Sequence, residues 1–510
     1  MYLHVFPVAV SFIALASTAV AAGAQRPLIC YWESWSRYRV APYTGSVENI
    51  PIHLCTHLIY AFAGLDENTW KVKSLEPYWD LDLGGFNQLV ALKQKNPKLK
   101  VSFAVGGWNE GATKYSDLVS DPNRIKIFVD SVMQWITTFG FDGLDLDWEY
   151  PADAARGGKS QDKANLIVLL RALRQALGEK LLTIATCIPV EKIAAGYDVP
   201  QMVKYVDFIH VMAYDLRGSW DNVIGNHVSL YPSANDRGLY SKLTVEQGMQ
   251  NWLDAGAPRE KLIMGLAFYG RSFKLADPSN KLQGALSGGS GTSGPVSQQD
   301  GTLFYFEICK KLREGWTRVF DDDTKTPRAF SGDQWVGYDD TEGIRHKIEL
   351  LDRKKYAGVM IWAIDLDDAS NSCGKGNYPL ATATFEALRG ENSEENEIDV
   401  GTRSSSGPTG WSTVSESDQK RTTESDQRRT TETNTRREVV TESGPIVDCS
   451  SGEGFLPHPT HCSMFIRCVS RKPVEMTCPT GLIFDASVSV CNWPVDVDPK
   501  LPKGCPDANP

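Results

Sequence analysis

Continuous apolar runs recur along residues 25–390, and stretches with apolar residues at helical spacing lie between them. Runs that are apolar throughout are typical of parallel strands that are covered on both faces. Eight such runs can be counted: Leu28–Trp32, Leu58–Ala63, Val101–Val105, Gly143–Trp148, Leu182–Ile188, Val206–Ala213, Leu262–Ala267 and Gly358–Ile364. Helical periodicity fills the intervals, for example Asn123–Phe139, Lys163–Leu177 and Glu342–Lys354. Eight strand–helix units predict an α/β fold, a (β/α)₈ TIM barrel, whose chemistry lies at the C-terminal ends of the strands.

The interval between the seventh and eighth strands is too long for a single helix. It contains a Gly/Ser-rich run, Ser287–Gly294, and short strand-like pieces. Long intervals without structure of their own are uncommon in compact domains. We therefore expect a small α+β insertion at about residues 272–340 within the domain of residues 25–390.

Composition changes abruptly after residue 390. Residues 391–445 contain almost no Leu, Ile or Phe and are rich in Ser, Thr, Glu and Arg, with an octapeptide that starts at Glu416 and repeats at Glu424. Such a segment cannot offset its ordering entropy, so we expect a flexible linker. Its Ser/Thr density suggests O-glycosylation.

The first apolar run, Val8–Ala22, is too short to span a bilayer and ends in the small residues Ala22-Gly23-Ala24. This pattern predicts a signal peptide over residues 1–24 and a secreted, extracellular protein. The region before the run lacks Lys and Arg, which leaves a membrane anchor as the alternative. No later stretch approaches the ~20 apolar residues of a membrane span.

Charge and aromatic content narrow the classes of partner. The formal net charge is -10, which argues against a nucleic-acid binder and a basic membrane-surface protein. Aromatic residues make up 10% of the chain and include 14 Trp. This excess suits either core packing or ligands with flat apolar faces, among which sugars are the commonest.

The fourth predicted strand carries a row of acids. Asp145, Asp147 and Glu149 alternate with apolar residues, so their side chains leave one face of the strand, ~6–7 Å apart in steps of two residues. That face is expected to be the barrel interior, because helices must cover the other face: Leu144, Leu146 and Trp148. Repulsion and desolvation should keep a proton in the row near neutral pH, and a proton on Glu149, the outermost member, makes a general acid. Ca²⁺ or Mg²⁺ binding is the competing interpretation. No further metal-ligand or phosphate-binding motif accompanies the row, so we expect no metal or cofactor.

The row Asp142-x-x-Asp145-x-Asp147-x-Glu149 resembles the signature of family-18 glycoside hydrolases, the chitinases. Similar motifs lie on the other predicted strands or at their C-terminal ends: Cys30-Tyr31-x-x-x-Trp35, Phe62, Gly106-Gly107-Trp108-Asn109, Met212-Ala213-Tyr214-Asp215, Phe268-Tyr269-Gly270-Arg271 and Met360-Ile361-Trp362. The resemblance implies hydrolysis of β-1,4-linked N-acetylglucosamine with retention of configuration, in which the substrate supplies the nucleophile.

The resemblance also implies a role for each residue. Glu149 would protonate the glycosidic oxygen, Asp147 would bond the acetamido nitrogen, Asp145 would share a proton with Asp147, and Tyr214 would donate to the acetamido oxygen. The implied groove residues are Tyr31, Trp35, Phe62, Trp108, Asn109, Tyr150, Met212, Asp215, Tyr269, Arg271 and Trp362. Of these, Trp362 would form the floor beneath the distorted sugar.

Six cysteines crowd residues 446–510, as in a small disulfide-rich β domain: Cys449, Cys462, Cys468, Cys478, Cys491 and Cys505. Spacing alone leaves all pairings open, and zinc is the rival interpretation. With Gly481–Asp485 and Cys491–Pro494, the region resembles peritrophin-A type (family-14) chitin-binding modules. That resemblance implies the pairs Cys449–Cys468, Cys462–Cys505 and Cys478–Cys491, and Phe465 and Trp493 are the candidate rings for sugar. In the barrel the family resemblance implies the pairs Cys30–Cys55 and Cys309–Cys373, and leaves Cys187 as a buried thiol.

Three functions fit these features. The favoured one is a secreted endochitinase that is tethered to chitin by its tail and acts on chitin and chito-oligosaccharides. We expect this enzyme to be a monomer. The rivals are a catalytically silent chitin lectin on the same fold and an endoglycosidase of N-glycans. Retention of Glu149, Asp147 and Tyr214 argues against the lectin, and the chitin-type tail argues against the endoglycosidase.

Overall fold

The computed structural model describes residues 26–390, 449, 454–459, 461–469, 472–478, 483–485 and 490–492. The expected signal peptide and linker therefore lie outside the described residues. Two compact units divide the chain: residues 26–390 belong to the first and the described part of residues 449–492 to the second. No helix among the described residues is long and apolar enough to cross a membrane.

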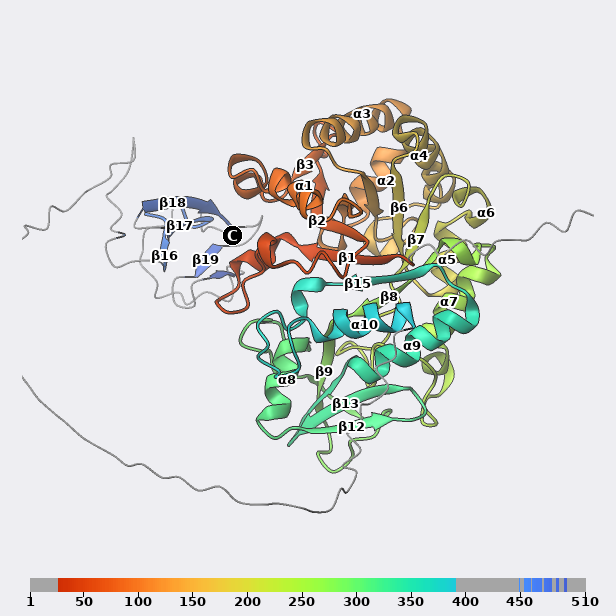
Figure 1. The fold of residues 1–510 in the computed structure, drawn as a ribbon, viewed down its shortest axis with the longest axis vertical. Helices are drawn as coiled ribbons and strands as arrows, with labels where there is room; N and C mark the ends of the chain where they lie inside the picture. Colours follow the sequence, from red (N-terminus) through yellow and green to blue (C-terminus); the bar gives the residue numbers. More distant parts are fainter. Residues whose placement is uncertain are drawn as a thin grey trace, which may run out of the picture. The chain divides into compact units, whose positions relative to one another are not determined.

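Eight parallel strands close into a barrel within residues 26–390 (Figure 1). They are β1 (Leu28–Glu33), β2 (His57–Leu65), β4 (Lys100–Gly106), β5 (Gly143–Asp147), β6 (Leu181–Thr186), β7 (Phe208–Val211), β8 (Leu262–Ala267) and β15 (Gly358–Trp362). Their order is β1-β15-β8-β7-β6-β5-β4-β2, and the pairing of β1 with β2 closes the ring. A short strand, β3 (Val72–Ser74), adds antiparallel to β2. The expected TIM barrel is confirmed, because each strand overlaps its predicted run and no end differs by more than two residues.

Helices surround the strands and bury their outer faces (Figure 1). They are α1 (Gly85–Lys95), α2 (Thr113–Val119), α3 (Pro122–Phe139), α4 (Asp162–Leu177), α5 (Val190–Gly196), α6 (Val199–Met202), α7 (Val245–Asp254), α9 (Thr341–Lys354) and α10 (Pro379–Arg389). Local sequence sets the helix ends. The Asp121 side chain accepts from the backbone N–H of Asn123 at the start of α3, and Gly140 ends that helix in the left-handed conformation.

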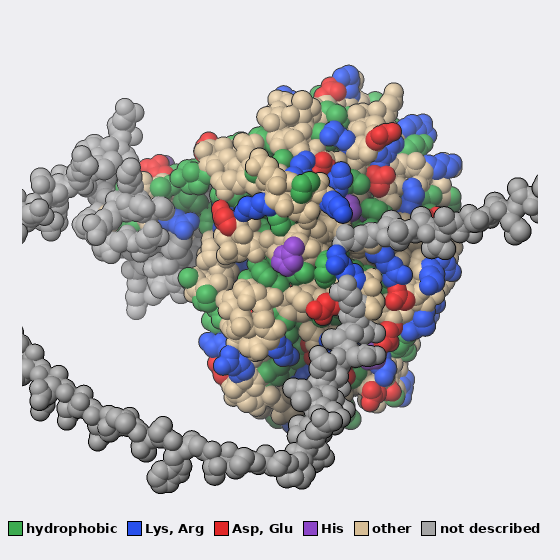
Figure 2. Space-filling view, viewed as in Figure 1, with side chains coloured by type: hydrophobic (Ala, Val, Ile, Leu, Met, Phe, Trp, Pro, Cys, Tyr) green, Lys and Arg blue, Asp and Glu red, His purple; other side chains and the backbone are tan. Residues whose placement is uncertain are grey.

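Short helical turns lie in the connections between these elements. They are η1 (Ser34–Tyr38), η2 (Val47–Asn49), η3 (Tyr78–Asp82), η4 (Trp108–Glu110), η5 (Ala154–Arg156), η6 (Gly238–Lys242), η7 (Arg259–Lys261) and η8 (Ile364–Leu366). Of these, η1, η4, η5 and η8 follow β1, β4, β5 and β15 at the C-terminal ends of the strands, the open end of the barrel. Charged side chains of both signs are interspersed over the face shown in Figure 2, so this face carries no continuous basic patch.

The interval between β8 and β15 forms the expected α+β insertion. It contains an antiparallel sheet in the order β10-β9-β14-β13-β12, with β11 paired to β9, and one helix. Its elements are β9 (Tyr269–Leu275), β10 (Ser287–Ser290), β11 (Thr302–Phe304), α8 (Tyr305–Arg313), β12 (Thr317–Asp321), β13 (Thr326–Ser331) and β14 (Gln334–Gly337). The first strand begins at Tyr269, three positions before the expected start, and its buried residues pack with Ile224 from the loop after β7. The insertion therefore rests on a loop of the barrel's open end.

The described part of the tail consists of short antiparallel strands. A three-stranded sheet contains β16 (Gly454–Pro457), β17 (Met464–Val469) and β18 (Lys472–Thr477), and a hairpin contains β19 (Ile483–Asp485) and β20 (Val490–Asn492). Its small core is made by Ile466 and the Cys449–Cys468 disulfide. The disulfide replaces the apolar area that so short a domain cannot bury.

Candidate active site

The acids of β5 form a column that runs from the barrel core toward its open end. Asp145, Asp147 and Glu149 are 0%, 3% and 7% exposed, so accessibility rises along the strand. Strand β5 ends at Asp147, one residue earlier than predicted, and Glu149 therefore lies just beyond it. The residues on the other face are buried apolar side chains, as the alternation requires: Leu144, Leu146 and Trp148.

Asp145, the innermost acid, is contacted by side chains of three other strands, β1, β6 and β7. The Tyr31 hydroxyl donates to its Oδ2 at 2.7 Å, and the Thr183 hydroxyl donates to its Oδ1 at 2.5 Å. His210 Nδ1 lies 2.7 Å from the Tyr31 hydroxyl and 3.2 Å from Asp145 Oδ1, while His210 Nε2 has no partner among the described residues. Tyr31, expected to line the groove, is instead buried beneath it and supports Asp145.

Sequence reasoning did not single out Thr183 and His210. Both lie in runs that are otherwise mostly apolar, on β6 and β7, and both are buried. A polar residue inside an apolar barrel strand is costly to bury without a partner. That cost is the signal that could have marked them as partners of an inward-facing acid.

The pKa values of the two outer acids are raised. Burial raises the pKa of Asp147 well above its ordinary value, and the carboxyls of Glu149 and Asp145 raise it further. Burial also raises the pKa of Glu149 to about 7. The proton sharing expected between Asp145 and Asp147 stays a prediction. Asp147 Oδ1 is buried without a partner among the described residues and is available to a ligand.

Tyr214 and Asp215 follow β7 at the same end of the barrel. Tyr214 is buried, and its hydroxyl lies 3.8 Å from Met360 Sδ. Asp215 accepts from the Tyr269 hydroxyl at 2.7 Å and from Arg271 Nε and Nη2 at 2.7 and 2.6 Å. Desolvation favours the protonated acid, but the Arg271 guanidinium outweighs it and holds the pKa of Asp215 below its ordinary value. Asp215 is therefore an anion beside the column.

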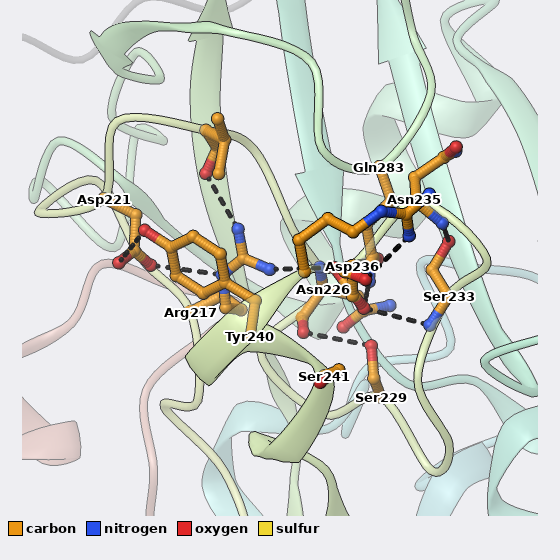
Figure 3. A network of polar contacts seen from close by, with 12 residues as sticks. Arg217, Asp221, Asn226, Ser229, Ser233, Asn235, Asp236, Tyr240, Ser241 and Gln283 are labelled. Carbon is orange, nitrogen blue, oxygen red and sulfur yellow. Dashed lines mark hydrogen bonds and ion pairs between the residues drawn. The ribbon is translucent and has the colours of Figure 1, made fainter.

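The loop that follows Asp215 is anchored by a polar network around Arg217 (Figure 3). Arg217 is buried and pairs with Asp221 and Asp236, at 3.3 Å each, and its guanidinium lies over the ring of Tyr240. Asp236 also accepts from Gln283 Nε2 of the insertion at 3.0 Å. The network ties this loop to the insertion and so restrains the segment that carries Tyr214 and Asp215.

Aromatic rings stack across the ends of β1, β2 and β15. Phe62 stacks on Trp362 with ring centroids 5.3 Å apart, and Trp35 stacks on Phe62 at 6.0 Å. Trp35 is 39% exposed, and Trp362 is half-buried. Met212, at the end of β7, is also half-buried. The stack presents a flat apolar surface beside the acids, the kind of surface that binds the face of a sugar.

Trp108 and Asn109 lie at the open end of β4, where both are exposed. The chain reaches this position through Gly106 and Gly107, which have positive φ angles of 130° and 91°. A Cβ on Gly106 would lie 1.9 Å from the carbonyl oxygen of Asp147, so only glycine lets β4 approach the acid-bearing strand there. Tyr150, half-buried, follows Glu149.

A buried ion cluster that the sequence did not reveal fixes the ends of β1 and β15. Arg39 Nη2 pairs with Glu33, and Arg39 Nη1 donates to Asp365 Oδ2 at 2.8 Å. The backbone N–H of Glu33 donates to Asp365 Oδ1 at 2.9 Å. Trp35 lies in η1, between Glu33 and Arg39. The cluster therefore holds the turn that presents Trp35 against β15. No sequence spacing marks it, because Asp365 is more than 300 residues away from Glu33 and Arg39.

Disulfides connect Cys30 with Cys55, Cys309 with Cys373, and Cys449 with Cys468, the pairs that the family resemblances imply. Cys187 is a buried free thiol. Cys462 and Cys478 are also disulfide-bonded, and the side chains of their expected partners, Cys505 and Cys491, lie outside the described residues.

Of the two candidate sugar-binding rings of the tail, the structure describes only Phe465. Phe465 is half-buried and stacks on Phe484, with centroids 4.9 Å apart. One face of the Phe465 ring is therefore covered by the buried ring of Phe484. Trp493 lies outside the described residues.

Among the described residues, no three Asp, Glu, His or Cys side chains are arranged to hold a metal ion. The structure thus brings the acids, Tyr214, Asp215, the aromatic stack and the exposed Trp108 to one end of the barrel. This set combines a protonated acid with flat rings and fixed anions, which suits acid-catalysed cleavage of a sugar chain.

Known proteins that act on sugar chains resemble this protein along most of its length. Residues 27–367 match the family described as glycosyl hydrolases family 18, and residues 449–499 match the chitin binding Peritrophin-A domain. The endochitinase of Manduca sexta is 35% identical over 531 aligned positions, which cover 94% of this chain and 96% of that protein.

Solved structures agree. The group IV chitinase of Ostrinia furnacalis, in complex with allosamidin, superposes with a TM-score of 0.70 at 37% identity over 72% of this chain and 99% of that one. Human YKL-39, a pseudo-chitinase with retained chitooligosaccharide binding properties, superposes with a TM-score of 0.67 at 33% identity over 71% of this chain and 100% of that one. The chain therefore belongs to family 18 of the glycosyl hydrolases and carries a Peritrophin-A chitin-binding domain.

Proposed function

We propose that this protein is a secreted endochitinase that cleaves β-1,4 linkages between N-acetylglucosamine units of chitin with retention of configuration. The observation that carries the proposal is the state of Glu149. Burial raises the pKa of Glu149 to about 7, so this acid at the open end of the barrel holds a proton near neutral pH. A general acid works best when its pKa lies near the working pH.

The first step transfers the Glu149 proton to the glycosidic oxygen, and the bond from that oxygen to the anomeric carbon breaks. The carbonyl oxygen of the substrate's own acetamido group attacks the anomeric carbon and closes an oxazolinium ring. Asp147 Oδ1, which has no partner among the described residues, accepts the acetamido N–H and stabilises the positive ring. Glu149, now a carboxylate, takes a proton from water, and the water oxygen opens the ring from the face the leaving sugar occupied.

The surrounding residues orient the sugar. Among the described residues, the hydroxyl of Tyr214 donates only to the Met360 sulfur, a weak acceptor that a carbonyl oxygen of the acetamido group would replace. Asp215, held as an anion by Arg271, bonds sugar hydroxyls. Trp362 and the rings stacked on it form the floor, and Trp108 and Asn109 line the groove on the other side of the acid.

The disulfides support secretion, and the tail supports action on insoluble chitin. Disulfides persist in oxidising compartments, and the barrel contains two of them. The Peritrophin-A domain of residues 449–499 would hold the enzyme on insoluble chitin and raise the local concentration of substrate. We expect a monomer, because the proposed groove is built by residues of one chain.

The decisive experiment is hydrolysis of the N-acetylglucosamine hexamer, with the anomeric form of the products followed by NMR. Initial release of the β-anomer from internal linkages would support the proposal. The similarity to YKL-39 makes a silent lectin the second candidate, and that lectin would bind the hexamer with no turnover. Initial release of the α-anomer would contradict the substrate-assisted mechanism.

A further inference from the structure

Arg156 joins Glu149 to Trp108, and the proposed mechanism gives it no role. Its Nε donates to the carbonyl oxygen of Glu149 at 2.7 Å, and its Nη2 donates to the carbonyl oxygen of Trp108. The same guanidinium lies over the indole of Trp108, with Cζ 3.5 Å from the ring centroid. One planar group therefore makes three contacts with two residues of the site.

The loop around Arg156 is folded tightly enough to hold the side chain in place. The Asp153 side chain accepts from the backbone N–H of Ala155 and begins η5. The carbonyl oxygen of Arg156 accepts from the N–H of Ala112, just beyond the turn that carries Trp108. At Gly157, φ is +87° and a Cβ would lie 2.0 Å from Thr113 Oγ1, so this close approach requires glycine.

Trp108 needs such support because it is 58% exposed. An indole on the surface without packing samples several rotamers, and a sugar that stacks on it must first select one. A guanidinium over one face fixes the ring, since Arg stacks favourably on Trp. The opposite face stays free for a sugar.

We propose that Arg156 is a positioning residue for the hydrolytic reaction, which fixes the Trp108 indole and the main chain of Glu149 as one rigid unit. A sugar that stacks on Trp108 is then held in register with the carboxyl that protonates its linkage. This inference rests on the proposed function of Glu149 and the groove.

The charge of Arg156 has a second, separable effect. The ionisable groups that face Glu149 are Asp147, Tyr150, Arg156, Cys187, Lys192, Tyr197, Tyr214 and Asp215. Burial raises the pKa of Glu149, and Arg156 and Lys192 are the two cations in this set that oppose the rise. Without the Arg156 charge the pKa of Glu149 is higher, so the acid keeps its proton to higher pH. The decline of kcat/KM on the alkaline side, the alkaline limb, therefore shifts to higher pH.

The test uses Arg156→Gln and Arg156→Lys, with hexamer hydrolysis measured across pH. Arg156→Gln should raise KM by about 10-fold, because it removes charge-assisted hydrogen bonds and a stacked cation. It should also shift the alkaline limb to higher pH. Arg156→Lys should raise KM but leave the limb in place, because it keeps the charge and loses the planar contacts. The matched control is Arg124→Gln, which removes an Arg stacked on Trp70 away from the site and should change neither quantity.

A double-mutant cycle with Trp108→Ala separates positioning from general damage. If Arg156 acts through Trp108, the double variant Arg156→Gln/Trp108→Ala should have almost the same KM as Trp108→Ala alone. Full additivity of the two effects on KM, or an alkaline limb that does not move in Arg156→Gln, would overturn the proposal. Hexamer affinity is also measured in a Glu149→Gln background, where weaker binding by Arg156→Gln supports positioning without any turnover. Undiminished activity of Glu149→Gln alone refutes the proposed function, while the affinity result still decides the role of Arg156.

Discussion

Replacing Glu149 by Gln removes one proton donor and leaves the size of the side chain almost unchanged. The proposed mechanism needs that proton for departure of the leaving sugar, so kcat on N-acetylated oligosaccharides should fall by about 10²–10⁴-fold or more. In the unsubstituted enzyme, kcat/KM should decline above about pH 7, because the acid loses its proton as pH rises through a pKa that burial raises to about 7.

The same substitution should stabilise the fold in alkaline solution. The pKa of Glu149 is raised from 4.5 to about 7, so between these pH values the folded protein keeps a proton that the unfolded chain has released. Stability therefore falls as pH rises through this window, and the cost reaches about 3 kcal/mol near pH 8. Gln avoids this cost because it has no charge at any pH. For a domain of this size the gain corresponds to a rise in Tm of about 4 °C near pH 8 and almost none near pH 4.

Thermal unfolding at both pH values, together with kcat on the hexamer, provides the assay. Glu314→Gln is the matched control, because the Glu314 side chain is 58% exposed and its replacement uncovers no buried charge. Undiminished activity of Glu149→Gln, or a Tm difference from the unsubstituted enzyme that is equal at the two pH values, would refute the reasoning that burial holds a proton on this acid.

Four further predictions test the chemistry, the scaffold and the tail. Fully deacetylated chitosan should not be hydrolysed, because it lacks the acetamido nucleophile; measurable product by reducing-end assay would count against the mechanism. Replacing Cys309 and Cys373 by Ser opens a cross-link between residues 64 positions apart and should lower the free energy of unfolding by about 4 kcal/mol, measured by denaturant titration. Arg217→Met leaves buried Asp236 without its cation and should cost about 3 kcal/mol or more, and an unchanged unfolding midpoint would show that the ion pair is dispensable. Deleting residues 446–510 should reduce retention on insoluble chitin in a pulldown but leave kcat on the soluble hexamer unchanged.

The barrel could be predicted from the sequence because its signals are local. A strand covered on both faces must be apolar along its length, and eight such runs lie within two residues of the observed strands. The acid column could be predicted for the same reason. A period of two places Asp145, Asp147 and Glu149 on one face wherever the strand lies.

The partners of those acids could not be predicted in the same way. Asp145 is bonded by Tyr31 of β1, which does not neighbour β5 in the sheet, and by Thr183 of β6, which does. Only the closed barrel decides that these two side chains reach the acid. Tyr31 was expected in the groove because the family resemblance places its motif at the end of the first strand, yet its hydroxyl reaches inward to Asp145. The start of the insertion at Tyr269 was missed because β9 follows β8 with no turn residue between them.

By itself, the sequence determined the order of strands and helices, the acids of the fourth barrel strand and the separation of the barrel from a cysteine-rich tail. Each of these depends on residues that are neighbours along the chain. Only the tertiary structure decided which side chains surround the acids, that Arg156 joins Glu149 to Trp108, and that Arg39 links Glu33 to Asp365. Hydrogen bonds and stacking act over a few ångströms, so contacts between distant segments exist only after closure of the barrel has brought those segments together.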